Sequence, residues 1–396
     1  MTTPACFPPR SHFSATEFDN VISLDIRFGS TSVPVLLGTG PSLQRATDAA
    51  IRALAPDRVL VVVDAVVARL YPDDVERFAG LGSLAGVVFV APEGELCKTF
   101  PVLGDVAQTF LEGGATKRSL VLVFGGGAPM NLGGLTAALL YRGLRLCYVP
   151  TTLMGQHDVV PSMKTAINVC DRKNNFGTFH AASLNVVDTH YLRTLAADEL
   201  RSGMGELIKN ALILGGEHLD VAERMLDAHA RDAVDDTLLT EMVDAGIRAK
   251  LPALVVDKQE ASTGMIFEYG HTVGHALELS FPPGMLPHGL ALCWGMRCCS
   301  YVASRLGMMD DVQVARHDAL IQGLLPEALP QPLPTVSEVM FRVMRDGKRG
   351  RINEAADECS CVLLTAVGEP LPTDTMLSTF PSALVAEWLR AQGLRD

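Results

Sequence analysis

Hydrophobic residues in the first half of the chain form short continuous runs, separated by stretches with a helical pattern. Runs that are apolar throughout, rather than alternating with polar residues, are typical of parallel strands covered by helices on both faces. Stretches with helical periodicity lie between them, for example residues 103–114 and 132–143. The pattern predicts an α/β domain with a mostly parallel sheet. The predicted strands are residues 58–64, 86–92, 119–127, 144–152 and 184–189.

The pattern changes after about residue 190, where strand-like runs largely disappear. Segments such as "ADELRSGMGELIKNALIL" and "HGLALCWGMRCCSYVASRLG" carry apolar residues at helical spacing. A length of 396 residues also exceeds what one core usually needs. We therefore expect an α/β domain over residues 21–190 and a mostly α-helical domain over residues 191–396. The Pro-, Ser- and Thr-rich start, residues 1–20, is predicted to be a disordered tail.

Composition excludes several classes of function. A net charge of −12 argues against a general nucleic-acid binder, which needs a basic surface, so an anionic ligand must meet a local basic pocket. Residues 119–141 are uncharged and long enough for a membrane span, but Gly125–Gly127 and Pro129 interrupt them. A buried strand, a glycine turn and a helix fit better. Nine cysteines without a CxxC pair or a secretion signal predict reduced thiols and a cytoplasmic location.

The triple glycine Gly125–Gly127 stands between a predicted strand and a predicted helix. Glycines there let the backbone approach a phosphate at the helix N-terminus, although an ordinary tight turn fits equally well. Asp64 ends an earlier strand and could bind a ribose hydroxyl or cap the next helix. Glu95 and Lys98, in "GELCK", are three residues apart, as in many solvated helix starts.

The stretch from Val149 to Thr178 is dense in polar residues and begins where a strand ends. Ligands of open α/β sheets bind at this carboxyl edge, although a polar surface loop is the plainer alternative. Its candidate binding residues are Thr151, Thr152, Asp158, Lys164, Asn168, Lys173 and Asn174.

Acidic residues and histidines in the second half could bind a metal. Glu206 and Lys209 share a helical face among apolar neighbours, so they form either a surface ion pair or a buried one. In "EYGHTVGH", a helix would place Glu268, His271 and His275 on one face. His288 follows, and zinc takes such nitrogen and carboxylate ligands. Spacing alone cannot choose between His271 with His275 and His271 with His288.

Taken together, these motifs resemble those of the sugar-phosphate cyclases, the family of 3-dehydroquinate synthase. The resemblance runs from about Asp64 to Lys348 and is carried by "GELCK", "NLGGL", "VPTTL", "GMGELIK", "GHTVGHALE" and the "HG" at His288. It implies an NAD-binding α/β domain, a helical domain for metal and substrate, and one divalent ion, zinc or cobalt. It also implies a sugar phosphate as substrate, a homodimer, and no nucleic-acid or membrane partner.

The resemblance also implies roles for individual residues. It places the metal on Glu206, His271 and His288. It gives Lys164, Lys209, Glu268 and His275 to catalysis, and it gives Asn174, Lys250, Lys348 and Arg142 to substrate binding, with Arg142 reaching from a neighbouring subunit. The NAD-binding residues that it implies are Asp64, Glu95, Lys98, Gly126, Gly127, Asn131, Thr151, Thr152, Asp158, Lys173, Thr194 and Glu199.

Three positions narrow the substrate. 3-Dehydroquinate synthase carries an arginine where this chain has Gly264 and an asparagine where it has Glu268, so a carboxylate-bearing substrate is disfavoured. Members acting on sedoheptulose 7-phosphate usually carry proline at His275. The chain looks most like members that cyclise D-glucose 6-phosphate with loss of phosphate, for aminoglycoside-type antibiotic biosynthesis. The alternatives are a cyclase for sedoheptulose 7-phosphate or the dehydroquinate precursor, and a metal-dependent polyol dehydrogenase.

Overall fold

A seven-stranded, mostly parallel sheet forms the first half of the molecule. The computed structural model describes residues 18–170 and 172–396, so residues 1–17 of the predicted tail lie outside the described part. The strand order is β1-β2-β9-β6-β5-β3-β4, and all neighbours are parallel except β1 and β2. The predicted fold class is confirmed. The strands are β1 (Ile22–Phe28), β2 (Thr31–Gly38), β3 (Val59–Asp64), β4 (Val87–Ala91), β5 (Leu120–Gly125), β6 (Arg145–Pro150) and β9 (Leu184–Asp188).

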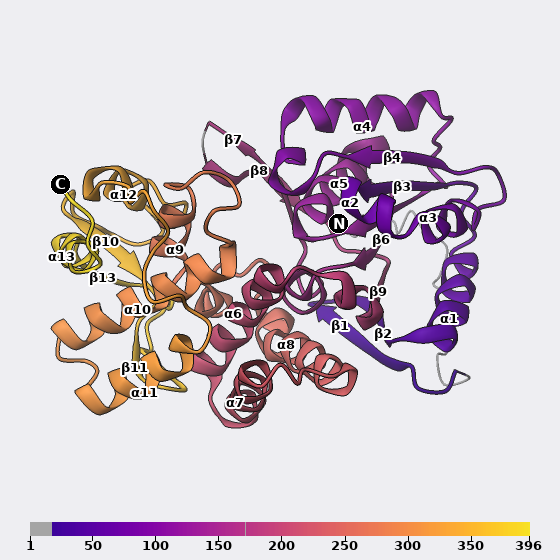
Figure 1. Cartoon of the computed structure of the whole chain (residues 1–396). Helices are drawn as coiled ribbons and strands as arrows, with labels where there is room; N and C mark the ends of the chain where they lie inside the picture. Colours follow the sequence, from indigo (N-terminus) through magenta and orange to yellow (C-terminus); the bar gives the residue numbers. More distant parts are fainter. Residues whose placement is uncertain (1–17, 171) are drawn as a thin grey trace.

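Helices cover both faces of this sheet (Figure 1). Because side chains of a strand alternate between faces, Leu60 and Val62 of β3 pack on one side with α4 and α5, and Val61 packs on the other with α1 and α3. Both faces are apolar, which explains the continuous runs. The elements are α1 (Gly40–Ala53), α2 (Ala65–Leu70), α3 (Pro72–Ala79), η2 (Gly94–Cys97), α4 (Phe100–Glu112), α5 (Gly127–Leu139) and η3 (Leu140–Arg142).

Residues 149–170 and 172–178 contain a helical turn and a hairpin rather than the alternative surface loop. A π-helical turn, η4 (Gly155–Val159), follows β6, and an antiparallel hairpin of β7 (Lys164–Val169) and β8 (Arg172–Phe179) comes next. The hairpin contacts α5 and stands between the two halves of the molecule (Figure 1). It thereby brings polar residues of the first half toward the second.

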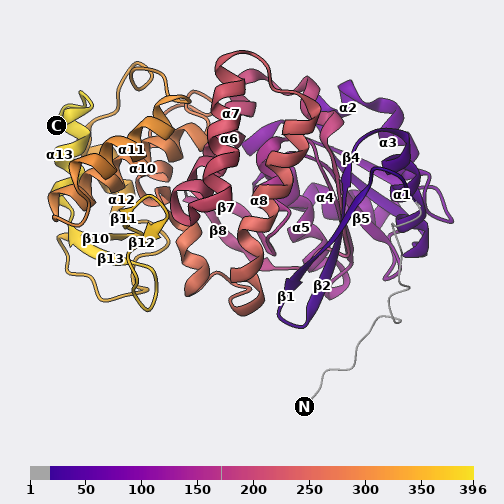
Figure 2. The same cartoon turned by 90° about the horizontal axis from the view of Figure 1, so that it is seen from below.

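The second half is mostly helical, as expected, but four short strands near its end were not predicted. Seen from below, α6, α7 and α8 lie between the sheet and the last part of the chain (Figure 2). The helical elements are η5 (Thr189–Thr194), α6 (Ala197–Leu214), α7 (Gly216–Ala230), α8 (Asp236–Val256), η6 (Thr263–Glu268), α9 (His271–Glu278), α10 (His288–Arg305), α11 (Asp311–Gln322), α12 (Val336–Val343) and α13 (Ala383–Ala391). The strands are β10 (Glu358–Cys361), β11 (Leu364–Ala366), β12 (Glu369–Pro370) and β13 (Ser378–Pro381).

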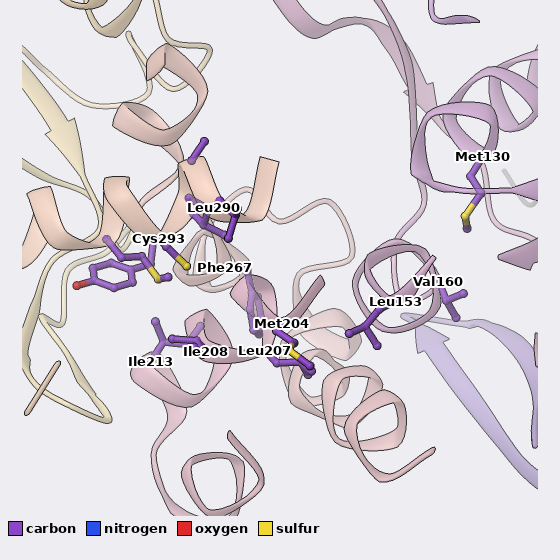
Figure 3. Close-up of a cluster of buried hydrophobic side chains, with 14 of the residues drawn as sticks. Met130, Leu153, Val160, Met204, Leu207, Ile208, Ile213, Phe267, Leu290 and Cys293 are labelled. Atoms are coloured by element: carbon purple, nitrogen blue, oxygen red, sulfur yellow. The ribbon is translucent and has the colours of Figure 1, made fainter. Parts of the chain in front are cut away.

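A continuous hydrophobic core joins the halves. Figure 3 shows buried side chains from Met130 on α5, through Leu153 and Met204, to Cys293 on α10. Within the described residues, no helix is long and apolar enough to cross a membrane. The uncharged stretch 119–141 is the strand β5, a glycine turn, the helix α5 and the start of η3, as its interrupting glycines indicated. The shared core holds the carboxyl edge of the sheet against the helices that carry the histidines.

Candidate active site

The carboxyl ends of the parallel strands bring several predicted cofactor residues to one edge of the sheet. Asp64 ends β3, Gly126 follows β5, and Thr151 follows β6. The Asp64 carboxylate accepts hydrogen bonds from the backbone N–H groups of Val66 (2.8 Å) and Gly94 (3.3 Å). Asp64 therefore caps α2, as its alternative interpretation proposed, while its role toward a ribose stays a prediction.

The glycine turn leaves bare backbone at the N-terminus of α5. A Cβ atom on Gly126 would meet Cγ2 of Thr152 at 2.8 Å, so no side chain fits there. Bare N–H groups at a helix start suit a phosphate of a nucleotide. Asn131 is occupied locally, since its amide donates to the carbonyl of Gly127 (3.0 Å) and accepts from the backbone of Ala166 on β7 (3.1 Å). It links α5 to the hairpin.

Other predicted cofactor residues form an ionic cluster between η2 and the hairpin. The Lys98 ammonium, only 2% exposed, lies 2.5 Å from Oδ1 of Asn174 and 3.5 Å from Oε1 of Glu95. Glu95 also accepts from Asn168 (2.7 Å) and lies 3.5 Å from Nζ of Lys173. Burial lowers the pKa of Lys98, with Glu95 opposing the shift. "GELCK" therefore supplies a buried lysine and an exposed glutamate to one charge network, and the solvated helix start that was its alternative is wrong for Lys98.

Asp158 holds two lysines that were assigned to catalysis and substrate binding. It lies in η4, and its Oδ1 is 2.6 Å from Nζ of Lys250 and 3.6 Å from Nζ of Lys209. Both ammonium groups also lie over the ring of Phe267, 5.6 and 5.8 Å from its centroid. A π-helical turn is common at functional sites, and here it places one carboxylate between two buried cations.

Glu206, His271 and His288 converge from three helices. Oε1 of Glu206, on α6, lies 3.4 Å from Nε2 of His271 and 3.3 Å from Nε2 of His288. The other ring nitrogens are engaged: Nδ1 of His271 faces the carbonyl of Tyr269 (3.2 Å), and Nδ1 of His288 faces Glu278 (3.0 Å). With an ion bound, each Nδ1–H would donate outward and leave the Nε2 lone pair, which now faces Glu206, for the metal. The donor set fits a divalent ion with nitrogen and oxygen ligands.

His275 also reaches this centre. One ring nitrogen of each of His271, His275 and His288 lies within 4.8 Å of the others. The sequence left open whether His271 pairs with His275 or with His288, and the structure places all three histidines together. Burial, together with His271 and His288, holds the pKa of His275 well below its usual value. A neutral His275 offers a lone pair to a metal or to a substrate proton.

Burial opposes ionisation of Glu206, but its neighbours outweigh burial. Glu206 is 1% exposed, and its second oxygen contacts Nζ of Lys209, one turn along α6. Lys209 and His271 hold the pKa of Glu206 well below its ordinary value. The sequence left open whether Glu206 and Lys209 form a surface ion pair or a buried one, and the structure shows a buried pair.

The expectation that Glu268 shares a helical face with His271 and His275 is wrong. Glu268 ends η6, and α9 begins at His271 after Gly270, whose φ is +77°. A side chain at Gly270 would be strained, and its Cβ would meet Met296 at 2.5 Å. Glycine at position 270 therefore permits both the close approach of α10 and the left-handed turn that separates Glu268 from the helix.

Tertiary contacts nevertheless bring Glu268 into the site. Its carboxylate lies 3.3 Å from Nζ of Lys348 and 3.5 Å from Nζ of Lys164. Burial raises the pKa of Glu268, but Lys348, His271 and Lys164 lower it more, so it stays ionised. Each lysine has a further partner: Lys348 lies 2.9 Å from Asp346, and Lys164 lies 2.7 Å from Glu260.

Sequence reasoning missed Glu260 and Glu278. Glu260 has a φ of +52° and is 5% exposed, and nothing in its sequence surroundings signalled its contact with Lys164. Glu278 closes "GHALE", and that motif was the signal available for it. Both carboxylates partner lysines of the hairpin from the helical half.

The remaining predicted residues lie at the rim. Thr194 is exposed at the end of η5 and shares a hydrogen bond with the Tyr71 hydroxyl (2.8 Å), and Glu199 is exposed in the first turn of α6. Arg142 is exposed at the end of η3, with a φ of +62°. The roles assigned to these three residues stay predictions.

Comparison with known proteins extends over most of the chain. Residues 88–202 match the family of 3-dehydroquinate synthase N-terminal domains, and residues 203–349 match the C-terminal domains. 2-Deoxy-scyllo-inosose synthase of Micromonospora echinospora is 36% identical over 370 residues, which cover 92% of this chain and 91% of that protein. The enzyme of the same name from Streptoalloteichus tenebrarius is 38% identical over 374 residues, 92% and 94% of the two chains.

Solved structures of related proteins share the fold of this chain. A crystal structure of 2-deoxy-scyllo-inosose synthase complexed with carbaglucose-6-phosphate, NAD+ and Co2+ superposes with a TM-score of 0.83 at 28% identity, covering 94% of this chain and all of that one. An iron-containing alcohol dehydrogenase, with a TM-score of 0.59 at 13% identity over 89% and 95% of the two chains, shares the fold alone. The motifs, the fold and these relatives confirm the resemblance: the chain belongs to the 3-dehydroquinate synthase family of sugar-phosphate cyclases.

Proposed function

We propose that this enzyme cyclises D-glucose 6-phosphate to 2-deoxy-scyllo-inosose with loss of phosphate, using NAD and one divalent metal, in the biosynthesis of aminoglycoside-type antibiotics. The observation that carries the choice of substrate is the ionised Glu268 between Lys164 and Lys348. A carboxylate accepts hydrogen bonds from sugar hydroxyls and repels a carboxylate substrate. Relatives at 36–38% identity that are named for this reaction support the proposal.

The surroundings of Gly264 support a neutral substrate end. The Gly264 N–H donates to Asp257 (2.9 Å), and a Cβ atom there would meet the side chain of Glu260 at 3.0 Å. The space beside Gly264 is thus filled by an acidic residue, and Gly264 itself supplies no cation for a substrate carboxylate. The lysines around Glu268 and Asp158, of which Lys164 is exposed and the others are buried, instead supply the charged donors that a phosphate needs in an acidic protein.

NAD, bound at the carboxyl edge of the sheet, supplies the acceptor for the hydride of a secondary alcohol and later returns that hydride. A divalent ion held by Glu206, His271 and His288 supplies Lewis-acid polarisation of hydroxyl and carbonyl oxygens. Oxidation to a ketone acidifies the neighbouring C–H. Loss of that proton expels phosphate with the C–O bonding pair. After hydride return, ring opening and aldol closure form the carbocycle, with no net oxidation.

The chain's own residues position the reactants and handle protons. Neutral His275 offers a lone pair that can take a proton near the metal centre. Lys209 stays charged: burial lowers its pKa, but Glu206 and Asp158 raise it further. Lys164 and Lys348 hold Glu268 toward the substrate hydroxyls. Lysines from both halves therefore surround the same substrate.

We also propose a homodimer in which Arg142 reaches the phosphate site of the partner. Arg142 is exposed and follows the exposed side chains of Leu139 (55%) and Tyr141 (40%). An apolar surface next to a cation suits an interface with a second copy. Light scattering on the purified protein tests this: a dimer is expected, and a monomer at assay concentration would contradict it.

A comparison of three sugar phosphates tests the substrate. Incubation with NAD and Co2+ should release phosphate from D-glucose 6-phosphate and give a six-membered ketone. Turnover with sedoheptulose 7-phosphate or the dehydroquinate precursor, but not with D-glucose 6-phosphate, would overturn the proposal. A polyol dehydrogenase, the alternative in a different class, would accumulate NADH and leave phosphate in place.

A further inference from the structure

Glu278, the last residue of α9, contacts two functionally different groups at once. One carboxylate oxygen lies 3.0 Å from Nδ1 of His288, and the other lies 2.5 Å from Nζ of Lys173. The Glu278 side chain is 15% exposed and that of Lys173 is 9% exposed, so water screens the contact poorly. His288 belongs to the helical half and Lys173 to the hairpin of the nucleotide half.

The first contact orients a metal ligand. A carboxylate that accepts from Nδ1–H of a histidine fixes the ring tautomer and aims Nε2 at the ion. Nε2 of His288 lies 3.3 Å from Oε1 of Glu206, on the side where the other proposed ligand His271 also faces Glu206. The ion-pair partners of Glu278 in the described part of the chain are His288 and Lys173, and of these only His288 is a proposed metal ligand, so Glu278 acts on the metal through His288.

The second contact reaches the nucleotide site. Lys173 bridges Glu278 and Glu95, since its ammonium is also 3.5 Å from Oε1 of Glu95. Glu95 in turn accepts a hydrogen bond from Asn168 of β7 (2.7 Å). A nearly buried ammonium such as that of Lys173 needs carboxylate partners. If one partner of a buried ion pair is removed, the charge that remains is uncompensated and destabilises the protein. The orientation of Glu278 therefore depends on where the hairpin holds Lys173.

We propose that Glu278 is a positioning residue that couples the metal site to the nucleotide site through His288 and Lys173. The inference rests on the proposed function, which assigns the metal to His288 and NAD to Glu95 and Lys173. NAD on these residues fixes the hairpin, and the fixed Lys173 holds Glu278 and hence His288 in the ligand geometry. The first ligand to bind orders these side chains, and the second ligand then binds without that loss of conformational entropy. Each ligand therefore raises the affinity of the protein for the other by the same factor.

Metal affinity of the metal-free protein, measured with and without NAD, tests the coupling. Competition against a chromogenic zinc chelator should show zinc binding about fivefold or more tighter in the presence of NAD. Glu278→Gln keeps the size of the side chain but loses the charge, and zinc affinity should fall about 10- to 100-fold. NAD affinity, measured separately by calorimetry, should rise by the same factor when zinc is present.

Lys173→Met is the sharper variant, because Lys173 contacts no proposed metal ligand. We expect it to weaken zinc binding several-fold and, at NAD concentrations that calorimetry shows to saturate the variant, to abolish the effect of NAD on zinc, and Lys173→Arg should restore part of both. Glu241→Gln is the matched control: it removes an exposed carboxylate that pairs with Arg224, and zinc affinity should stay unchanged.

Two results would overturn the inference: equal zinc affinity of the wild-type protein with and without NAD, or retained coupling in the Lys173→Met variant. If Glu278→Gln fails to fold, Lys173→Met still decides the question. Failure of the proposed function is distinguishable, because the wild-type protein would then bind zinc and NAD with coupling but release no phosphate from D-glucose 6-phosphate.

Discussion

The nucleotide half and the helical half build their parts of the site in different ways. In the first, the groups sit at the ends of neighbouring strands and in the turn at Gly126, so backbone topology places them. In the second, buried side chains such as Glu206 on α6 and His271 on α9 come from separate helices and hold each other in place. A change at the glycine turn of the first should therefore act on cofactor binding alone, whereas a change in the second should spread to its ion partners.

Glu206→Ala should have the largest effect. It removes a proposed metal ligand and leaves Lys209, 1% exposed, with Asp158 at 3.6 Å as its remaining carboxylate partner. Breaking a buried pair costs about 3–5 kcal/mol. We expect loss of bound metal, loss of activity and a lower unfolding temperature. Metal analysis and calorimetry measure these, and a variant that binds metal as well as the parent would refute the ligand set.

Glu268→Asn should lower activity without a comparable loss of stability. Lys348 still pairs with Asp346 and Lys164 still pairs with Glu260, so neither lysine is left without a carboxylate partner. A hydrogen bond to a charged group is worth about 1.5–3 kcal/mol, so kcat/KM for D-glucose 6-phosphate should fall roughly 10- to 100-fold. Steady-state kinetics check this. An unchanged kcat/KM would remove Glu268 from the substrate site.

Gly126→Ala probes the nucleotide half by itself. The new Cβ would meet Thr152 at 2.8 Å. Overpacking costs about 1–3 kcal/mol, so NAD affinity should fall roughly tenfold while metal content stays normal. Gly104→Ala on α4, where an added Cβ meets nothing within 4 Å, is the matched control and should bind NAD as the parent does. Equal NAD affinity in the two variants would argue against a cofactor at this turn.

Asp257→Asn should have the smallest effect, on stability alone. Asp257 accepts from the backbone of Ala261, Ser262 and Gly264 in the loop that carries Glu260. Burial raises its pKa, but these hydrogen bonds lower it further, so the net shift is downward. The stabilisation is therefore present above the unfolded pKa of about 3.9 and is lost as pH falls through the lower folded value.

The difference in unfolding temperature between the parent and Asp257→Asn should accordingly be constant from neutral pH down to about pH 5 and shrink below about pH 4. Calorimetry across this range measures it. A difference that grew as pH fell would mean that the carboxylate is not stabilised in the folded state.

The contrast between the halves also explains what the sequence could predict. The strands β3, β4, β5, β6 and β9 were visible because each is a continuous apolar run, even though Val88 and Val90 of β4, at the edge of the sheet, are exposed. β1 and β2 were not predicted: "ISLDIRF" of β1, at the edge of the sheet, alternates apolar and polar residues instead of forming a continuous apolar run, and Pro34 interrupts the run of β2. The short strands β10 to β13 have two to four residues each and leave little pattern.

The site was predicted where motifs are local and missed where contacts are distant. Glu268 was placed on the wrong element because a left-handed turn at Gly270 separates it from α9, and the apolar spacing does not reveal that turn. Glu260 meets Lys164 across 96 residues of chain, and Glu278 meets Lys173 across 105. Such ion pairs follow from tertiary burial, which single-sequence spacing does not encode.

Turnover with a trace of NAD tests the central claim most directly. The purified enzyme with Co2+ is given D-glucose 6-phosphate in large excess over NAD, and phosphate, NADH and the organic product are measured together. The account predicts many equivalents of phosphate and of a six-membered ketone per NAD, with no accumulation of NADH. Product limited to one equivalent per NAD, with NADH accumulating, would contradict a cyclase that regenerates its cofactor.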